Sequence, residues 1–258
     1  MATLAPDGMG EFLPQGVDAV GAAFVVAASV LTSGLTAAVG IGGGVLLLAF
    51  LSFVIPPEAL IAVHAVAQLG SNSGRAALLA RHISVPVIMP FLVAAALGVA
   101  AGALIVSDLP ERVLIAIIGI FVLLTTWTKL PNFSGTGRVA LALGGFIASV
   151  LTMLVGATGP FVIAIIRQVC SDHIQVVATH AAAMTAQHGL KVVAFTVIGF
   201  AFVDYIPLLV AIIAAGFVGT LVGTRLLFKI PEKTLKTALK WTLTLIAAQL
   251  VLRAAFFM

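Results

Sequence analysis

The sequence predicts an all-α, polytopic membrane protein with two inverted-topology repeats of about five hydrophobic helical segments each, including short helices at Gly/Pro breaks. Three observations predict this fold. Hydrophobic residues make up 62% of the 258 residues and charged residues only 9%, whereas a soluble domain carries about 25% charged residues. The apolar residues form a series of span-length segments, and the second half repeats the pattern of the first. This composition excludes a soluble enzyme, a nucleic-acid reader and a disordered chain.

Apolar segments separated by charges and by Gly/Pro breaks define the expected helices. A helical span needs about 20 apolar residues, and the bilayer core is about 30 Å thick. At 1.5 Å per residue, the short second and seventh segments reach only about 20 Å, which is too little for a straight span. The ten segments are 17–39, 43–56, 58–80, 84–107, 111–130, 138–157, 159–171, 174–200, 205–228 and 233–257.

The distribution of charge predicts the orientation. With the N-terminus outside and all ten segments crossing, the inside loops hold most of the basic residues, such as Arg81, Lys129 and Arg138, and the outside loops hold acidic ones such as Glu58 and Asp204. This agrees with the positive-inside rule, so the net charge of +4 marks cytoplasmic loops and not a nucleic-acid partner. We expect a multi-pass protein of the bacterial plasma (inner) membrane. Its parts are an extracytoplasmic segment 1–16, a first repeat 17–130, a cytoplasmic linker 131–137 and a second repeat 138–258.

Internal matches relate the two halves. Ser33 and Ser149 are 116 residues apart, and the same offset pairs His64 with His180 and Arg75 with Lys191. An offset of 121 residues pairs further positions: Gly98 with Gly219, Gly102 with Gly223, and Pro110-Glu111 with Pro231-Glu232. Each half has five segments, an odd number, so the second half starts on the opposite side of the membrane. Secondary transporters commonly use this inverted arrangement, although channels with inverted repeats also exist.

Two glycine-rich breaks precede the two short segments. A helix that begins at such a break leaves its first N–H groups unpaired, and these groups bind anions. Glycine also allows the backbone to approach a ligand closely. The alternative interpretation is close helix packing, which glycine also serves in membranes. The candidate binding residues here are Gly42, Gly43, Gly44, Thr158, Gly159 and Pro160.

Polar residues form a stripe along the third and eighth segments, where they share one helical face. A cation within a span is costly unless it faces a polar cavity, and no carboxylate lies deep enough in a span to pair with Arg75 and Lys191. We therefore expect an anion site with no metal and no cofactor. The alternatives are that Arg75 snorkels to the inner interface and that His64 and His180 only form hydrogen bonds between helices. The stripe residues are His64, Gln68, Ser71, Asn72, Arg75, His180, Gln187, His188 and Lys191.

These motifs resemble the sulfite exporter TauE/SafE family of anion permeases over nearly the whole chain. The resemblance rests on the break at 40–44, the polar third segment, the Gly98/Gly102 segment followed by Leu109-Pro-Glu111, and the return of each motif in the second half. It implies transport of small organosulfur or carboxylate anions such as sulfite and sulfoacetate. The sequence departs from the family's pattern in lacking a Pro shortly after Gly44, and His64 and His180 stand where many members have Ser or Thr.

The function expected from these features is a secondary transporter, most simply an exporter of such an anion by alternating access. An anion channel of the same architecture is the alternative. Export of one negative charge from an inside-negative cell gains about 2.3 kcal/mol per 100 mV. An enzyme is disfavoured because hydrolase motifs are absent, and the single Cys170 excludes a dithiol relay. The expected partners are the small anion and the lipid bilayer, with no nucleic acid, and a homodimer is left open.

Overall fold

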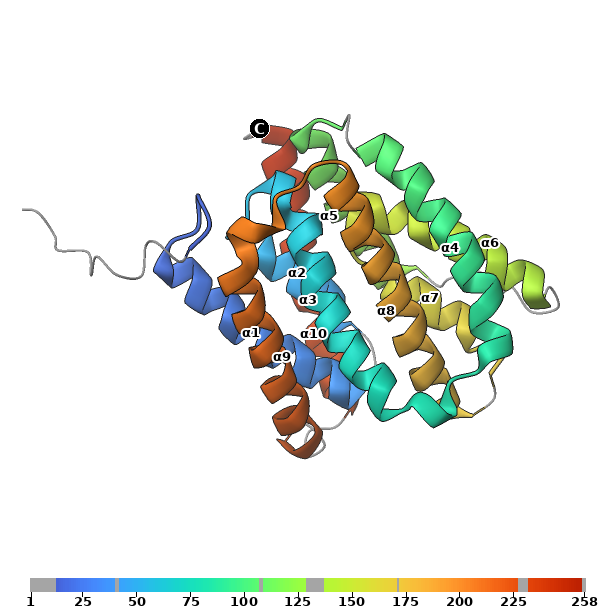
Figure 1. The fold of residues 1–258 in the computed structure, drawn as a ribbon. Coiled ribbons are helices and arrows are strands. Elements are labelled where there is room, and N and C mark those ends of the chain that lie inside the picture. Colours follow the sequence, from blue (N-terminus) through green and yellow to red (C-terminus); the bar gives the residue numbers. More distant parts are fainter. Residues whose placement is uncertain are drawn as a thin grey trace, which may run out of the picture.

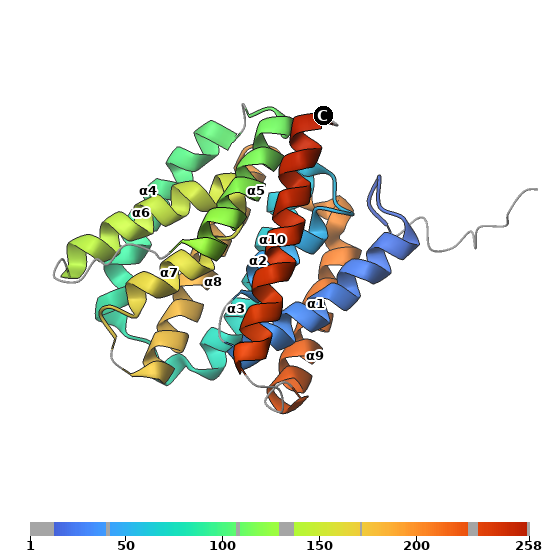
Figure 2. The ribbon, with the colours of Figure 1, turned by 180° about the vertical axis from the view of Figure 1, so that it is seen from behind.

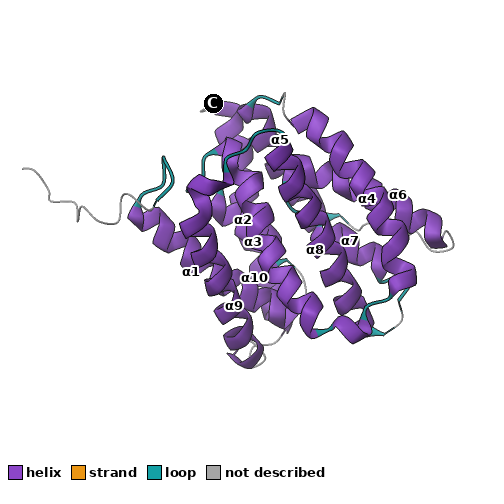
Figure 3. Cartoon of the chain, viewed as in Figure 1, coloured by secondary structure: helices purple, strands orange, loops and turns teal. Residues whose placement is uncertain are grey.

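A computed structural model of the chain describes residues 13–39, 42–106, 109–128, 137–170, 172–226 and 232–256. Every regular element in these ranges is a helix (Figures 1 and 3). The predicted segment 1–16 and linker 131–137 fall largely outside the described residues, and so does Gly40 of the first break. The α-helices are α1 (Ala19–Val39), α2 (Gly43–Leu51), α3 (Pro57–Leu78), α4 (Val85–Val106), α5 (Glu111–Trp127), α6 (Gly137–Val155), α7 (Gly159–Ile166), α8 (His173–Val197), α9 (Ile206–Leu226) and α10 (Glu232–Phe256), with short 3₁₀ helices η2 (Ala80–His82) and η3 (Phe202–Tyr205).

The helices confirm the prediction of a polytopic, all-helical membrane protein. Each α-helix overlaps one of the ten predicted segments. Within the described residues, five helical stretches are long and apolar enough to cross a membrane, and they belong to α1, α4, α6, α9 and α10. The central helices α3 and α8 are equally long but more polar, because they carry the two stripes.

The helices α2 and α7 are shorter than the sequence suggested. They have nine and eight residues, so each is only about 12–14 Å long at 1.5 Å per residue. Each follows a glycine with a left-handed backbone, Gly42 with a φ of 95° and Gly156 with a φ of 79°. Glycine adopts this conformation without a Cβ penalty, and the turn redirects the chain from α1 into α2 and from α6 into α7.

Helices of the N-terminal half of the chain pack mainly against helices of the C-terminal half. Helices α3 and α8 pack against each other at the centre, α1 packs on α9, α6 packs on α4, and α5 packs on α10 (Figures 1 and 2). Glycines allow α4 to pack closely on α6, and α9 to pack closely on α1. A Cβ added at Gly98 of α4 would overlap Phe146 O of α6, and one added at Gly219 of α9 would overlap Val30 O of α1.

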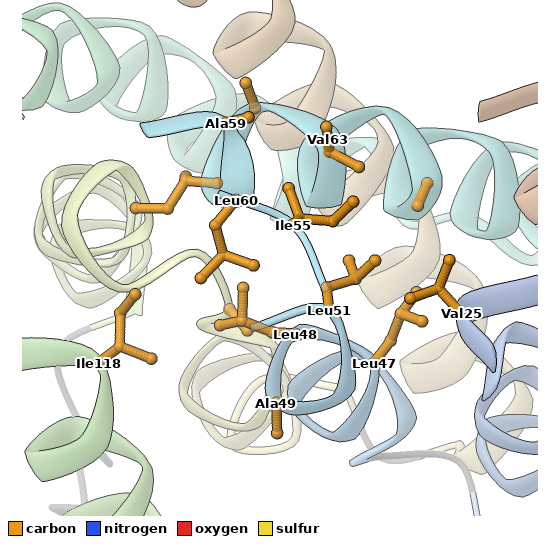
Figure 4. Packing of buried hydrophobic residues seen from close by; sticks show 14 of the residues in the cluster. Val25, Leu47, Leu48, Ala49, Leu51, Ile55, Ala59, Leu60, Val63 and Ile118 are labelled. Atoms are coloured by element: carbon orange, nitrogen blue, oxygen red, sulfur yellow. The ribbon is translucent and has the colours of Figure 1, made fainter. Parts of the chain in front are cut away.

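Apolar cores hold the short helices in place. Helix α2 is hydrophobic on all sides, and a helix of that kind is buried. Its residues Leu47, Leu48 and Leu51 pack with Leu60 of α3 and Ile118 of α5 (Figure 4). A second cluster surrounds α7 through Val162, Ile163 and Ile166, which pack with residues of α4 and α8. This burial positions the N-terminus of each short helix beside α3 and α8.

Candidate functional site

A cavity lies where the N-terminal ends of α2 and α7 meet the polar faces of α3 and α8. Its volume is about 40 Å³. One water molecule needs about 10–15 Å³ on the same measure, so the cavity has room for about three waters or for one small ion. The lining residues are Thr36, Gly42, Gly44, Val45, His64, Gln68, Asn72, Arg75, Ala157, Gly159, Pro160, His180, Met184 and His188.

The N-terminus of α2 contributes backbone donors to the cavity. The amide of Leu46 donates to Gly42 O over 3.0 Å. The amides of Gly43, Gly44 and Val45 come before Leu46 in the helix, so they have no acceptor within it. Of these residues, Gly44 and Val45 line the cavity. The partial positive charge of a helix N-terminus therefore faces this space.

The N-terminus of α7 offers fewer unpaired backbone N–H groups than the N-terminus of α2. Pro160 has no N–H, and the Phe161 amide already donates to Thr158 O over 3.0 Å. Gly159 is therefore the residue of this first turn whose amide has no acceptor inside the helix. The two glycine breaks match in sequence, but the structure makes them unequal as anion donors.

Four predicted residues of α3 line the cavity from one face of the helix. His64 is fully buried, and its Nε2 is 2.9 Å from Gly44 O. Further along, Asn72 Nδ2 donates to Gln68 Oε1 over 3.2 Å, and Arg75 Nη1 donates to Asn72 Oδ1 over 3.3 Å. The guanidinium thus joins the cavity through neutral amides, and none of the described lining residues is acidic.

Helix α8 supplies two histidines from the opposite side. His180 Nε2 is 3.1 Å from Gly159 O, which repeats the bond between His64 and Gly44. The expected alternative, in which both histidines join helices by hydrogen bonds, therefore describes part of their role. His188 packs edge to face on His64, with ring centroids 5.8 Å apart. The Nδ1 atoms of His64 and His188 are buried, and neither forms a hydrogen bond with a described residue by geometric criteria.

Five candidate residues lie behind the cavity wall. Gly43 contacts α1, where a Cβ would overlap Thr32 O, and Ser71 is only partly buried and does not line the cavity. Thr158 Oγ1 donates to Gln187 Oε1 over 3.2 Å, and Gln187 Nε2 donates to Ser149 Oγ over 2.9 Å. These buried bonds tie α6, α7 and α8 together and position the N-terminus of α7. Lys191 is the fifth of these residues.

Lys191 is fully buried outside the cavity. Its Nζ donates to Gly156 O over 2.9 Å and lies 3.4 Å from Thr152 Oγ1. The ammonium group therefore bridges the end of α6 and the turn between α6 and α7. Its repeat partner Arg75 lines the cavity, so the two equivalent cations have different surroundings in this structure.

Sequence reasoning missed four of the lining residues. Thr36 could have been found, since it is the repeat match of Thr152, and Met184 lies one turn from both His180 and His188. Val45 and Ala157 carry no polar signal that marks them as cavity residues. Their place in the wall depends on how the breaks fold.

Comparison with known proteins supplies one finding. A family model described as the sulfite exporter TauE/SafE matches residues 25–250, from within α1 to within α10. Comparison with curated proteins and with solved structures gives no match. The matched range includes both glycine breaks and both polar stripes.

Proposed function

The chain belongs to the sulfite exporter TauE/SafE family, and from this premise we propose that it exports a small organosulfur or carboxylate anion, such as sulfite or sulfoacetate, by alternating access. Family membership supports the coarser statement that the chain is a membrane anion transporter and not an enzyme. The observation that carries the finer proposal is the cavity at the meeting point of α2, α3, α7 and α8.

Charge and size in this cavity favour a small anion. Arg75 and the N-terminus of α2 bring positive charge, and the part of the lining that the structure describes contains no acidic residue. An unpaired charge in a membrane protein is stable only beside a polar cavity or a partner, and a bound anion is such a partner. The volume of about 40 Å³, which is room for about three waters, suits an ion of a few heavy atoms such as sulfite better than the larger sulfoacetate. In this proposal Gln68 and Asn72 add hydrogen bonds to the anion.

The packing of helices from one half on helices from the other half supports alternating access. In an inverted repeat, α1 corresponds to α6 and α4 to α9, so the pairs α1–α9 and α6–α4 are equivalent contacts. We infer a pseudo-two-fold axis in the membrane plane. In the opposite-facing state the cations exchange roles, so Lys191 lines the cavity and Arg75 bonds the backbone of the first break.

The proposed setting is the bacterial inner membrane with the N-terminus outside. Export of a single negative charge is then driven by the membrane potential, at about 2.3 kcal/mol per 100 mV. A coupling ion is not required in this scheme. An anion channel of the same architecture is the alternative, because it uses the same positive groups.

The test is flux through the full-length protein in liposomes. Sulfite and sulfoacetate are loaded, an imposed potential drives them out, and the initial rate is measured against concentration. We expect saturable flux that falls about 10- to 100-fold in Arg75→Gln, because a hydrogen bond to a charged group contributes about 1.5–3 kcal/mol. The matched control is Arg81→Gln, since Arg81 is exposed and not among the lining residues. Flux that does not saturate, together with single-channel currents, favours the channel, and no anion flux refutes the proposal.

A further inference from the structure

A second cavity lies where α3 and α5 begin and α8 ends, at the opposite end of α3 from Arg75. Its volume is about 300 Å³, compared with about 40 Å³ for the cavity described above. The residues at its rim are exposed and those at its floor are buried, so it opens at the protein surface. Its lining includes Glu58, Ile61, Glu111, Leu114, Phe195 and Ile198.

We propose that this second cavity is a release chamber, through which the anion leaves the protein, and that Lys191 is the gate between this chamber and the central cavity. The central cavity is the one at the N-termini of α2 and α7, lined by His64 and Arg75. The inference rests on the proposed function and deepens it, because it assigns the exit of the transport path and the residue that closes it.

The wall between the two cavities is thin. On α3, His64 lines the central cavity and Ile61 lines the release chamber, and these positions are about 4.5 Å apart at 1.5 Å of rise per residue. On α8, His188 lines the central cavity and Phe195 lines the release chamber, about 10.5 Å apart by the same rise. The two cavities therefore follow one another along the contact between α3 and α8.

Lys191 lies within this wall. It is one turn beyond His188 and one turn before Phe195, so the three residues share a face of α8. Its side chain is 0% exposed, and its described hydrogen bonds are to neutral groups of α6 and of the turn that follows α6. An ionisable group buried in a membrane protein is costly and marks the path of an ion. A wall that served only as a seal would be more stable with an apolar residue at this position.

The contacts of Lys191 show how such a gate can open. In this structure Nζ donates to Gly156 O over 2.9 Å and lies 3.4 Å from Thr152 Oγ1. An anion that reaches this end of the central cavity competes for the same N–H groups, and a hydrogen bond to an ionised acceptor is roughly twice as strong as one to a neutral acceptor. The anion therefore draws the ammonium group away from Gly156 O, and the turn that precedes α7 is freed to move.

The charge of the release chamber favours departure of the anion. Glu58 and Glu111 line the chamber from the first turns of α3 and α5, and both are exposed. The part of its lining that the structure describes contains no Lys, Arg or His. Because like charges repel, an anion that has passed Lys191 is not retained there. The central cavity with Arg75 binds the anion, and the chamber releases it.

The first experiment fills the release chamber. In a Cys170→Ser background, the full-length Ile198→Cys variant is coupled to a maleimide, freed of excess reagent and reconstituted into liposomes loaded with sulfite. Ile198 lines the chamber and is 43% exposed, so the reagent can reach it. We expect coupling to abolish sulfite efflux. The matched control is Val197→Cys, where coupling leaves efflux unchanged, because Val197 is 80% exposed and is not among the lining residues.

The second experiment separates gating from binding. Lys191→Gln keeps a donor for Gly156 O but removes the positive charge. We expect this variant to bind sulfite with the wild-type affinity in calorimetry and to lose about tenfold or more in efflux, because the open gate lacks its charge-assisted contact with the anion. Arg75→Gln is the contrasting variant, since it loses affinity and efflux together.

The outcomes separate this inference from the proposed function. Efflux that survives coupling at Ile198→Cys overturns the release chamber while leaving anion transport intact, and so does equal loss of efflux after coupling at Val197→Cys. Wild-type efflux in Lys191→Gln, or a parallel loss of affinity and efflux, overturns the gate. Absence of efflux from the uncoupled protein refutes the proposed function itself. If Lys191→Gln does not fold, coupling at Ile198→Cys still decides whether the anion leaves through the chamber.

Discussion

Adjacent glycines of the first break should respond in opposite ways to the same substitution. A Cβ at Gly43 would overlap Thr32 O and Thr36 Oγ1 of α1, and the backbone oxygen cannot turn aside. A Cβ at Gly44 would lie 3.0 Å from Gln68 Oε1, the end of a flexible side chain. Gly43→Ala thus tests the packing of α2 on α1, and Gly44→Ala tests the cavity.

The structure sets the expected magnitudes. Overpacking costs about 1–3 kcal/mol, and the clash at Gly43 is with backbone, so we expect about 2–3 kcal/mol. At about 2–4 °C for each kcal/mol in a chain of this size, Gly43→Ala lowers the Tm by about 4–12 °C. The methyl group of Gly44→Ala takes the space of about one water, 10–15 Å³, from a cavity of about 40 Å³. It also displaces Gln68, so we expect about a tenfold loss of anion affinity, or 1.4 kcal/mol.

The assay measures the Tm of each purified variant by fluorescence and its affinity for sulfite by calorimetry. Gly44→Ala should melt at the wild-type temperature or slightly above it, because Ala favours a helix more than Gly by up to about 1 kcal/mol. Wild-type affinity in Gly44→Ala would refute the assignment of the cavity as the binding site. An unchanged Tm in Gly43→Ala would refute the close contact of α2 with Thr32.

Three further predictions concern the cations, the helix contacts and the orientation. Lys191→Met should raise the Tm by about 2–4 °C, because an apolar side chain replaces a buried cation that has no acidic partner among its described contacts. The anion flux of this variant should fall at least about tenfold, because a charge-assisted contact is lost. A lower Tm would contradict this reasoning. Gly98→Ala should destabilise the protein by about 1–3 kcal/mol in chemical unfolding, whereas Gly74→Ala, which meets no atom within 4 Å, should be neutral. In a Cys170→Ser background, Arg81→Cys should react with an impermeant maleimide only from the cytoplasmic face, and labelling from outside would reverse the predicted topology.

The helices were predictable because their signal is local. The partition of a side chain between water and lipid depends on that side chain and its neighbours along the chain, so hydropathy located all ten helices. The two short helices were also predictable in place, since the breaks at 40–44 and 156–160 interrupt the apolar runs. Their lengths were overestimated because apolar residues continue beyond the last helical turn, as in Phe53 and Val54.

The site was predictable only in part, as Arg75 and Lys191 show. The two residues occupy matched positions of the polar stripes, and sequence reasoning gave them the same role. In the structure Arg75 lines the cavity, whereas Lys191 bonds Gly156 O behind the wall. The matched sequence positions therefore do not give the two cations the same contacts in this conformation.

The sequence by itself determined the class of protein, the helices and the polar face of α3 and α8. It did so because these properties follow from composition and from a periodicity of a few residues. Tertiary structure alone decided which donors meet in one cavity, that Gly44 faces it while Gly43 packs on α1, and that His64 directs its Nε2 hydrogen to Gly44 O. These outcomes depend on distances between helices far apart in the chain, and such distances are set by the packing of whole helices.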